Sequence, residues 1–106
     1  MKKWFLAMFV SIISLHGASL STTNVKINMI STYSDGIAHV QTIPRHDITG
    51  LSCTNDYWAI LDTNKPESKA IYSALIAAKM ADKQIHIEVN DTGSDTFCNL
   101  HRITIK

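Results

Sequence analysis

The chain has 106 residues, 45% of them hydrophobic, and a formal net charge of +1 at pH 7. This length predicts one small domain with one core. The nearly balanced charge, with no basic stripe, argues against a nucleic-acid partner.

The first nineteen residues predict a signal peptide. Residues 1–3 form a basic head, residues 4–15 are apolar apart from two serines, and residues 17–19 are small. The apolar run of about a dozen residues is shorter than the roughly 20 that a spanning helix needs, so cleavage is favoured over an anchor. We expect cleavage after Ser19, which leaves one domain over residues 20–106 with a charge of about −1. The mature protein is expected to be secreted or periplasmic in a bacterium, with no membrane span.

The mature chain contains two cysteines, Cys53 and Cys98. An even count in an exported protein predicts a disulfide between them. A redox centre or a metal site is the alternative, but the chain has no C-x-x-C pair and no zinc-like Cys/His spacing.

Two strands joined by a tight turn come first. Apolar residues alternate along residues 25–33, and residues 37–43 read as a second strand that Pro44 ends. The turn over residues 34–36 contains Asp-Gly, which readily adopts positive φ, so these strands are predicted to form a hairpin.

The rest of the chain predicts a strand, a helix and two more strands. The third strand covers residues 57–61, and Pro66 suits the first turn of a helix over residues 66–81. Thr63 or Asn64 is expected to cap this helix. Since apolar residues cover all but a narrow edge, we expect burial on more than one side. Strands over residues 84–90 and 96–105 follow, joined by a turn around Gly93.

The element order is β-β-β-α-β-β, which is the order of the OB-fold, a five-stranded, partly open barrel. Barrel closure would place the fifth strand parallel to the third and bring Cys53 and Cys98 to the same end of neighbouring strands. A two-layer α+β sandwich is the alternative.

Candidate ligand-binding residues follow from the fold. OB-folds bind ligands on strands two and three and on the loops that join strands one–two and four–five. Tyr57 and Trp58 are adjacent in a strand, so they are expected to point to opposite faces, one into the core and one toward a sugar or a subunit interface. The reading that both are packing residues is favoured over a contact with a ligand or subunit. The candidate residues are Ser34, Asp35, Tyr57, Trp58, Asp91 and Asp95.

Catalytic and metal-binding signatures are weak. The mature chain has four isolated histidines, at positions 39, 46, 86 and 101, and no G-x-S-x-G motif. Several loop carboxylates could form a pair, but such groups are usually only solvated. We expect no catalytic residue, no cofactor and no metal; a small hydrolase or metal protein is the least favoured reading.

Several segments carry a resemblance to known proteins. The segments 33–36, 57–63, 68–79 and 85–87 resemble those of small, uncharacterised secreted bacterial proteins that also have a cysteine before the Tyr-Trp strand and another after the post-helix strand. More distantly, the layout resembles the B subunits of AB5 toxins of the subtilase cytotoxin type. That resemblance implies a disulfide-linked OB-fold that binds cell-surface glycans as a five-membered ring.

Together these observations predict a secreted or periplasmic, non-enzymatic binding module. Its partner would be a glycan, and it would form a homo-oligomeric ring. The alternative is an envelope module that binds or inhibits another protein.

Overall fold

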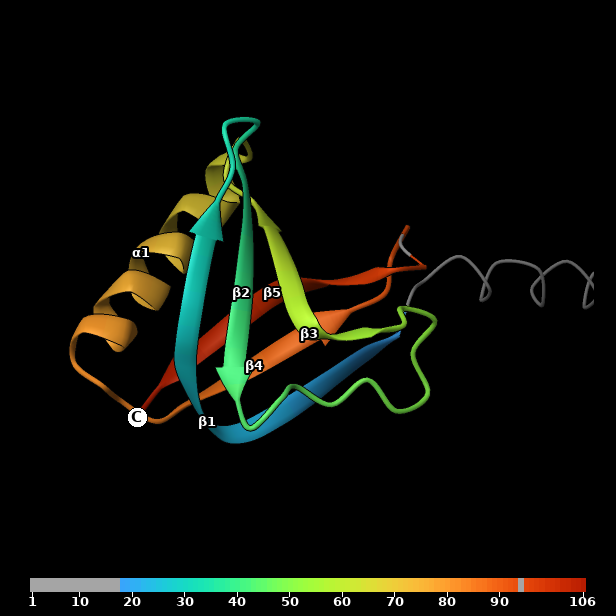
Figure 1. The fold of residues 1–106 in the computed structure, drawn as a ribbon, viewed down its shortest axis with the longest axis horizontal. Coiled ribbons are helices and arrows are strands. Elements are labelled where there is room, and N and C mark those ends of the chain that lie inside the picture. The colour runs from blue at the N-terminus through green and yellow to red at the C-terminus, as the bar shows by residue number, and fades with distance from the viewer. Residues whose placement is uncertain (1–17, 94) are drawn as a thin grey trace, which may run out of the picture.

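The computed structural model describes residues 18–93 and 95–106, within which five strands and one helix form a single barrel domain (Figure 1). The strands close in the order β1-β2-β3-β5-β4. This arrangement confirms the OB-like barrel and excludes the sandwich. Apart from its last two residues, the predicted signal peptide lies outside the described residues. The elements are β1 (Ser19–Thr32), β2 (Ile37–Ile43), β3 (Asn55–Asp62), α1 (Pro66–Met80), β4 (Ile85–Asn90) and β5 (Phe97–Ile105).

The barrel encloses a core of alternate strand residues. Val25, Val40, Ala59, Val89 and Leu100 come from the five strands, and each is at most 3% exposed. As predicted, β5 runs parallel to β3, while all the other neighbouring strands are antiparallel. The sheet therefore depends on a pairing between segments that are distant in the sequence.

The predicted disulfide between Cys53 and Cys98 is confirmed, with 5.2 Å between the two Cα atoms. Cys53 lies two residues before the start of β3, and Cys98 is the second residue of β5. Both side chains are buried in the core cluster. The disulfide therefore joins the two parallel strands at the end where both begin.

Strand β1 begins at Ser19, six residues earlier than predicted. Its first part pairs with β4 and its second part with β2, and the register shifts between Thr22 and Val25. Asn24 adopts a φ of 58° at this bend, a conformation that asparagine tolerates better than most residues. Before the bend, the backbone N–H of Ala18 donates to Asp91 Oδ1 at 2.8 Å. A cut after Ser19 would remove this contact.

The β1–β2 turn is tied to the segment between β3 and α1. Thr63 Oγ1 donates to the carbonyl of Gly36 at 2.6 Å, and Asn64 Nδ2 donates to the carbonyl of Asp35 at 2.8 Å. The prediction that Thr63 or Asn64 caps the helix is wrong, because the cap residue is Lys65 and no side chain bonds to the free amides. Gly36 has a φ of 87°, and a Cβ there would lie 2.6 Å from Asn64 Nδ2. The close approach thus requires glycine.

Helix α1 covers one end of the barrel along a single stripe. Its buried residues are Ser68, Leu75 and Ala78. Ile76 is 39% exposed and Met80 is 82% exposed, so the expectation of burial on more than one side is wrong for one copy of the chain. The helix ends at Met80, one residue earlier than predicted. Within the described ranges, no helix has the length and apolar character needed to cross a bilayer.

Candidate ligand-binding surface

Five aromatic side chains form a continuous surface, here called the aromatic strip: Tyr33, His39, Tyr57, Trp58 and Phe97. The His39 ring lies at its centre, with centroids 4.6 Å from Tyr33, 5.3 Å from Phe97 and 5.9 Å from Trp58. Tyr57 extends the strip beyond Trp58, with their centroids 5.1 Å apart. The two contacts of His39 with Trp58 and Phe97 are edge-to-face, a favoured geometry for aromatic pairs.

The strip lies on the outer face of β2, β3 and β5. His39 lies between the buried residues Ala38 and Val40, so its side chain points away from the core. Trp58 precedes buried Ala59 on β3, and Phe97 precedes buried Cys98 on β5 in the same way. Strands β2 and β3 form part of the surface that OB-folds use for ligands.

Tyr57 and Trp58 do not point to opposite faces, so that prediction is wrong. Asn55 Oδ1 accepts hydrogen bonds from the backbone N–H groups of both residues, each at 2.9 Å. The β3–β5 register also shifts between Asn55 and Ala59. This local departure from regular strand geometry lets the two rings meet edge to face, and both residues are half-buried.

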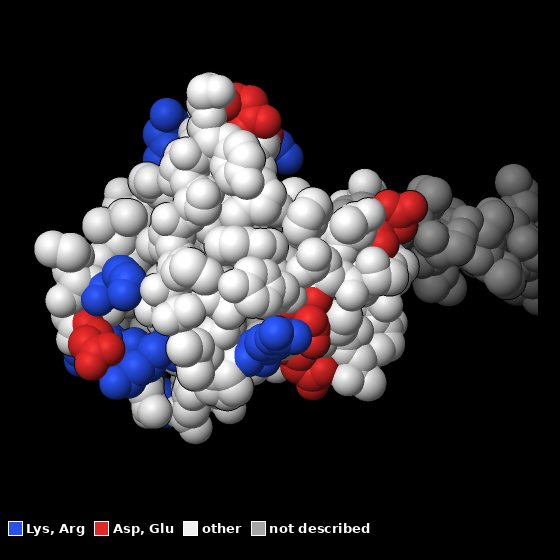
Figure 2. Space-filling model, viewed as in Figure 1, with Lys and Arg blue, Asp and Glu red and all other residues white. Residues whose placement is uncertain are grey.

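On the face shown in Figure 2, charged side chains lie at the top, on the left and in one group of both signs below and to the right of the centre, and a broad uncharged area lies above that group. Beside the aromatic strip, the Arg45 guanidinium lies 5.2 Å from the centroid of the Tyr57 ring. Asp56 accepts from Arg45 at 3.4 Å. The cation next to the strip is therefore already paired with an aromatic ring and a carboxylate.

A cavity of about 440 Å³ lies between the start of α1 and the β3–β5–β4 part of the barrel. Ile60 and Asn99 are register partners on its wall. Ile60 follows Trp58 by two positions on β3, and Asn99 follows Phe97 by two positions on β5. Since residues two apart on a strand share a face, the cavity and the aromatic strip belong to one outer surface.

The predicted β1–β2 loop residues serve mainly to shape the turn. Asp35 Oδ1 accepts from the Ile37 backbone N–H at 2.9 Å, which is an Asx turn. Ser34 is exposed. Their neighbour Tyr33 is 56% exposed and reaches the strip. This loop therefore contributes an aromatic ring that the sequence analysis did not select.

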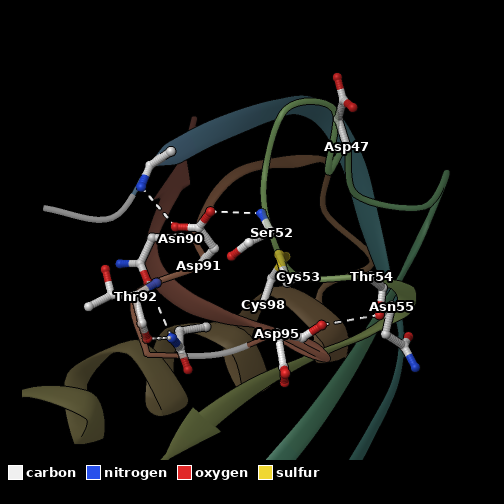
Figure 3. Close-up of a disulfide and its surroundings, with 12 residues drawn as sticks. Asp47, Ser52, Cys53, Thr54, Asn55, Asn90, Asp91, Thr92, Asp95 and Cys98 are labelled. Carbon is white, nitrogen blue, oxygen red and sulfur yellow. Dashed lines mark hydrogen bonds between the residues drawn. A yellow bond between two sulfur atoms is a disulfide. The ribbon is translucent and has the colours of Figure 1, made fainter. Parts of the chain in front are cut away.

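The predicted β4–β5 loop residues lie around the disulfide (Figure 3). The Asp91 carboxylate accepts from the backbone N–H groups of Ser52 and Ala18, each at 2.8 Å. These bonds, the one from Ser52 first, lower the pKa of Asp91. The backbone carbonyl of Asp95 accepts from Thr54 Oγ1 at 3.3 Å. Asp91 therefore links the start of β1 to the segment that precedes β3.

The two predicted loops do not meet. Gly36 in the first loop bonds to Thr63, just after β3, whereas Asp95 in the second bonds to Thr54, just before β3. Figure 1 shows the β1–β2 turn at the top, beside the start of α1, and the β4–β5 turn at the right. The structure therefore includes Tyr57 and Trp58 in the strip. The loops that contain Asp35 and Asp91 lie near opposite ends of β3.

The four histidines occupy different environments. His101 Nε2 lies 2.7 Å from Glu88 Oε2, and Arg102 lies 2.7 Å from the other oxygen of this carboxylate. The hydrogen bond from His101, together with the charge of Arg102, lowers the pKa of Glu88 against the opposing effect of burial. His86 is half-buried on β4. Among the described residues, no three His, Cys, Asp or Glu side chains are grouped closely enough to hold a metal ion.

His46 should make the fold acid-sensitive. It is 2% exposed, and within residues 18–93 and 95–106 neither ring nitrogen makes a hydrogen bond of good geometry. Burial lowers its pKa from the ordinary 6.5, and the backbone of Asn55 and the charge of Asp56 oppose this only in part. As the pH falls below 6.5, the unfolded chain binds a proton that the folded chain resists, so stability decreases.

The thermal midpoint of the wild type is therefore expected to fall between pH 7.5 and pH 5, and to fall less in His46→Leu. The carboxylates of Asp47, Glu88 and Asp91 have lowered pKa values, so they titrate below this window and do not interfere. Equal pH dependence in the two proteins would contradict this role for His46.

Three residues of the strip were missed by the sequence analysis: Tyr33, His39 and Phe97. His39 sits at an outward position of the predicted second strand, and Phe97 directly precedes Cys98. The alternation of β2 was thus a usable signal for His39. Nothing in the local sequence relates Tyr33 to Phe97. Both rings contact His39, but Phe97 reaches it only because the barrel closes.

The fold and this surface define a small disulfide-linked OB-like barrel with an aromatic outer face. No protein-family model matches the chain. No curated protein and no solved structure matches it either. The assignment of function therefore depends on the chemistry of the surface.

Proposed function

We propose that this protein is a secreted or periplasmic, non-enzymatic binding module that binds a glycan on the aromatic strip. The observation that carries the proposal is the set of five connected rings on the outer face of β2, β3 and β5. A disulfide suits an oxidising compartment. The known use of this OB-fold surface for oligosaccharides also supports the proposal.

The strip has the properties that sugar rings require of a protein surface. The faces of a sugar ring carry C–H groups that pack on aromatic side chains, and its edge carries hydroxyl groups that need hydrogen-bond partners. Tyr33, Trp58 and Phe97 offer apolar contact area. The adjoining cavity offers polar groups, among them Asn99 and His101. Such a surface combines both kinds of contact within one continuous site.

The proposal is tested by screening the purified protein against an array of glycans and measuring the best ligand by titration calorimetry. We expect Trp58→Ala and Tyr33→Ala each to weaken binding about tenfold, because each removes a ring from the contact surface. Tyr33 is the most exposed ring of the strip, so its replacement should leave the fold intact even if Trp58→Ala lowers stability.

Lys69→Ala serves as the control, since Lys69 is exposed on α1 and lies outside both the strip and the cavity; it should bind as the wild type does. A folded wild-type protein that binds no glycan on the array would overturn the proposal. So would retention of full affinity in both aromatic variants.

An envelope protein is the second candidate ligand, and one observation favours it. Arg45 lies over Tyr57, next to Trp58, and these three residue types dominate the binding energy of protein interfaces. A periplasmic protein that is captured by the wild type and lost with Trp58→Ala, in the absence of glycan binding, would favour this candidate.

The distant resemblance to AB5 B subunits extends the proposal to an assembly of several copies. One copy leaves Ile76 and Met80 of α1 exposed, and these apolar side chains are available for contact with a neighbouring copy. Several weak glycan sites in one ring would bind a cell surface together with much higher avidity. The native mass of the purified protein in solution reports this assembly directly.

A further inference from the structure

We infer that the cavity beside the aromatic strip binds the terminal sugar of the glycan, and that this sugar is a neutral hexose. This inference rests on the proposed function and adds a ligand class and a set of contacts to it. The cavity measures about 440 Å³, which is within the range of about 300–1,000 Å³ typical of small-ligand sites. It thus has room for a single sugar residue.

The cavity is lined by both apolar and polar side chains. Ile60 and Ile71 contribute apolar contact area, and Asn99 and Ser68 contribute polar groups. Mixed lining of this kind suits a hexose, which presents C–H groups on its face and hydroxyl groups around its edge. A purely apolar ligand would leave the polar groups without partners, at a cost in free energy.

Asn99 is held in place by its own hydrogen bonds. Its amide nitrogen donates to the carbonyl of Thr92 at 2.9 Å and to Asn90 Oδ1 at 3.3 Å. Both nitrogen protons are thereby engaged, and the carbonyl oxygen has no partner within the described part of the chain. A fixed acceptor costs little conformational entropy when it receives a sugar hydroxyl.

Ser68 places a second polar side chain in the cavity. The residue is 7% exposed and lines the cavity near the start of α1. A serine hydroxyl both donates and accepts hydrogen bonds, so it is a suitable partner for a sugar hydroxyl.

The charges around the cavity favour a neutral sugar over an anionic one. Asp62 and Glu67 each place a carboxylate on the rim, and Lys65 supplies one positive charge. The Asp62 carboxylate accepts from the backbone and the side chain of Asn64, which fixes its position. An anionic sugar such as a sialic acid would bring a further negative charge next to two existing ones.

The experiment compares one oligosaccharide that ends in a neutral hexose with the same oligosaccharide extended by a terminal sialic acid. We expect the wild type to bind the neutral form at least about tenfold more tightly. Ser68→Ala should weaken binding of the neutral form about fivefold, because one hydrogen bond is lost. Glu67→Lys should reduce the preference for the neutral form.

Ser73→Ala is the matched control, since Ser73 is an exposed serine on the same helix and does not line the cavity; it should bind as the wild type does. The inference fails if the sialylated form binds more tightly, or if Ser68→Ala and Glu67→Lys both bind as the wild type does. If that failure occurs while Tyr33→Ala and Trp58→Ala still weaken binding, the proposed function stands and only the terminal subsite is wrong. If no glycan binds at all, both fail.

Discussion

Replacing Cys53 and Cys98 together with alanine is expected to lower the free energy of unfolding by about 4 kcal/mol. The disulfide closes a loop with a sequence separation of 45, and in the chain-entropy model such a loop restricts the unfolded chain by this amount. A domain of this size has a total stability of about 5–10 kcal/mol. The double variant should therefore unfold at a much lower denaturant concentration than the wild type.

Chemical denaturation of the oxidised wild type, the reduced wild type and the double variant measures this effect. The reduced wild type is the matched control, because it keeps both cysteine side chains and lacks only the bond between them. It should lose nearly as much stability as the double variant. A loss below about 1 kcal/mol in both would show that the loop is restricted in some other way.

Leu75→Ala is expected to lower the free energy of unfolding by about 3 kcal/mol, because it leaves a cavity under the helix. Leu75 is 0% exposed and is the largest fully buried side chain of α1. Helix α1 contacts the barrel through β1, β3 and β5. The variant removes the main apolar contact that holds the helix to this end of the barrel.

Ile76→Ala is the control for this substitution. Ile76 is the next residue on α1 but is 39% exposed, and its replacement should lower the free energy of unfolding of a single copy by less than about 1 kcal/mol. Urea denaturation of both variants distinguishes a helix that is buried along one stripe from a helix that is buried on two sides. A comparable loss in both would contradict the orientation of α1.

The barrel topology was predictable because each strand carries a local signal. The alternation of residues 84–90 and the Asp-Gly turn at Asp35 are readable without any tertiary contact. The first part of β1 was not readable, because its partner β4 lies far away in the sequence and Asn24 interrupts the alternation. The prediction of the helix cap was wrong for the same reason, because the side-chain amide of Asn64 bonds to the distant β1–β2 turn.

The candidate surface was predictable only in part. Tyr57 and Trp58 were both selected as candidates, with one of them expected in the core. Their mutual contact depends on Asn55, which bonds to both of their backbone amides. Periodicity assumes a regular strand and therefore assigned the two rings to opposite faces. Asp91 was selected as a ligand residue because it lies in the loop between the fourth and fifth strands, which OB-folds use for ligands. Its oxygens instead accept from backbone amides across the fold.

The parallel pairing of β3 with β5 links the proposed ligand binding to the stability of the barrel. The two strands pair at Asn55, Ala59 and Ile60, with a register shift between the first two, so this is the most irregular junction of the barrel. His39 contacts Trp58 on one side of this junction and Phe97 on the other. Local opening of the barrel here would separate the rings of the aromatic strip. A ligand that contacts Trp58 and Phe97 together, as proposed, would stabilise the closed barrel, and its affinity would depend on that closure.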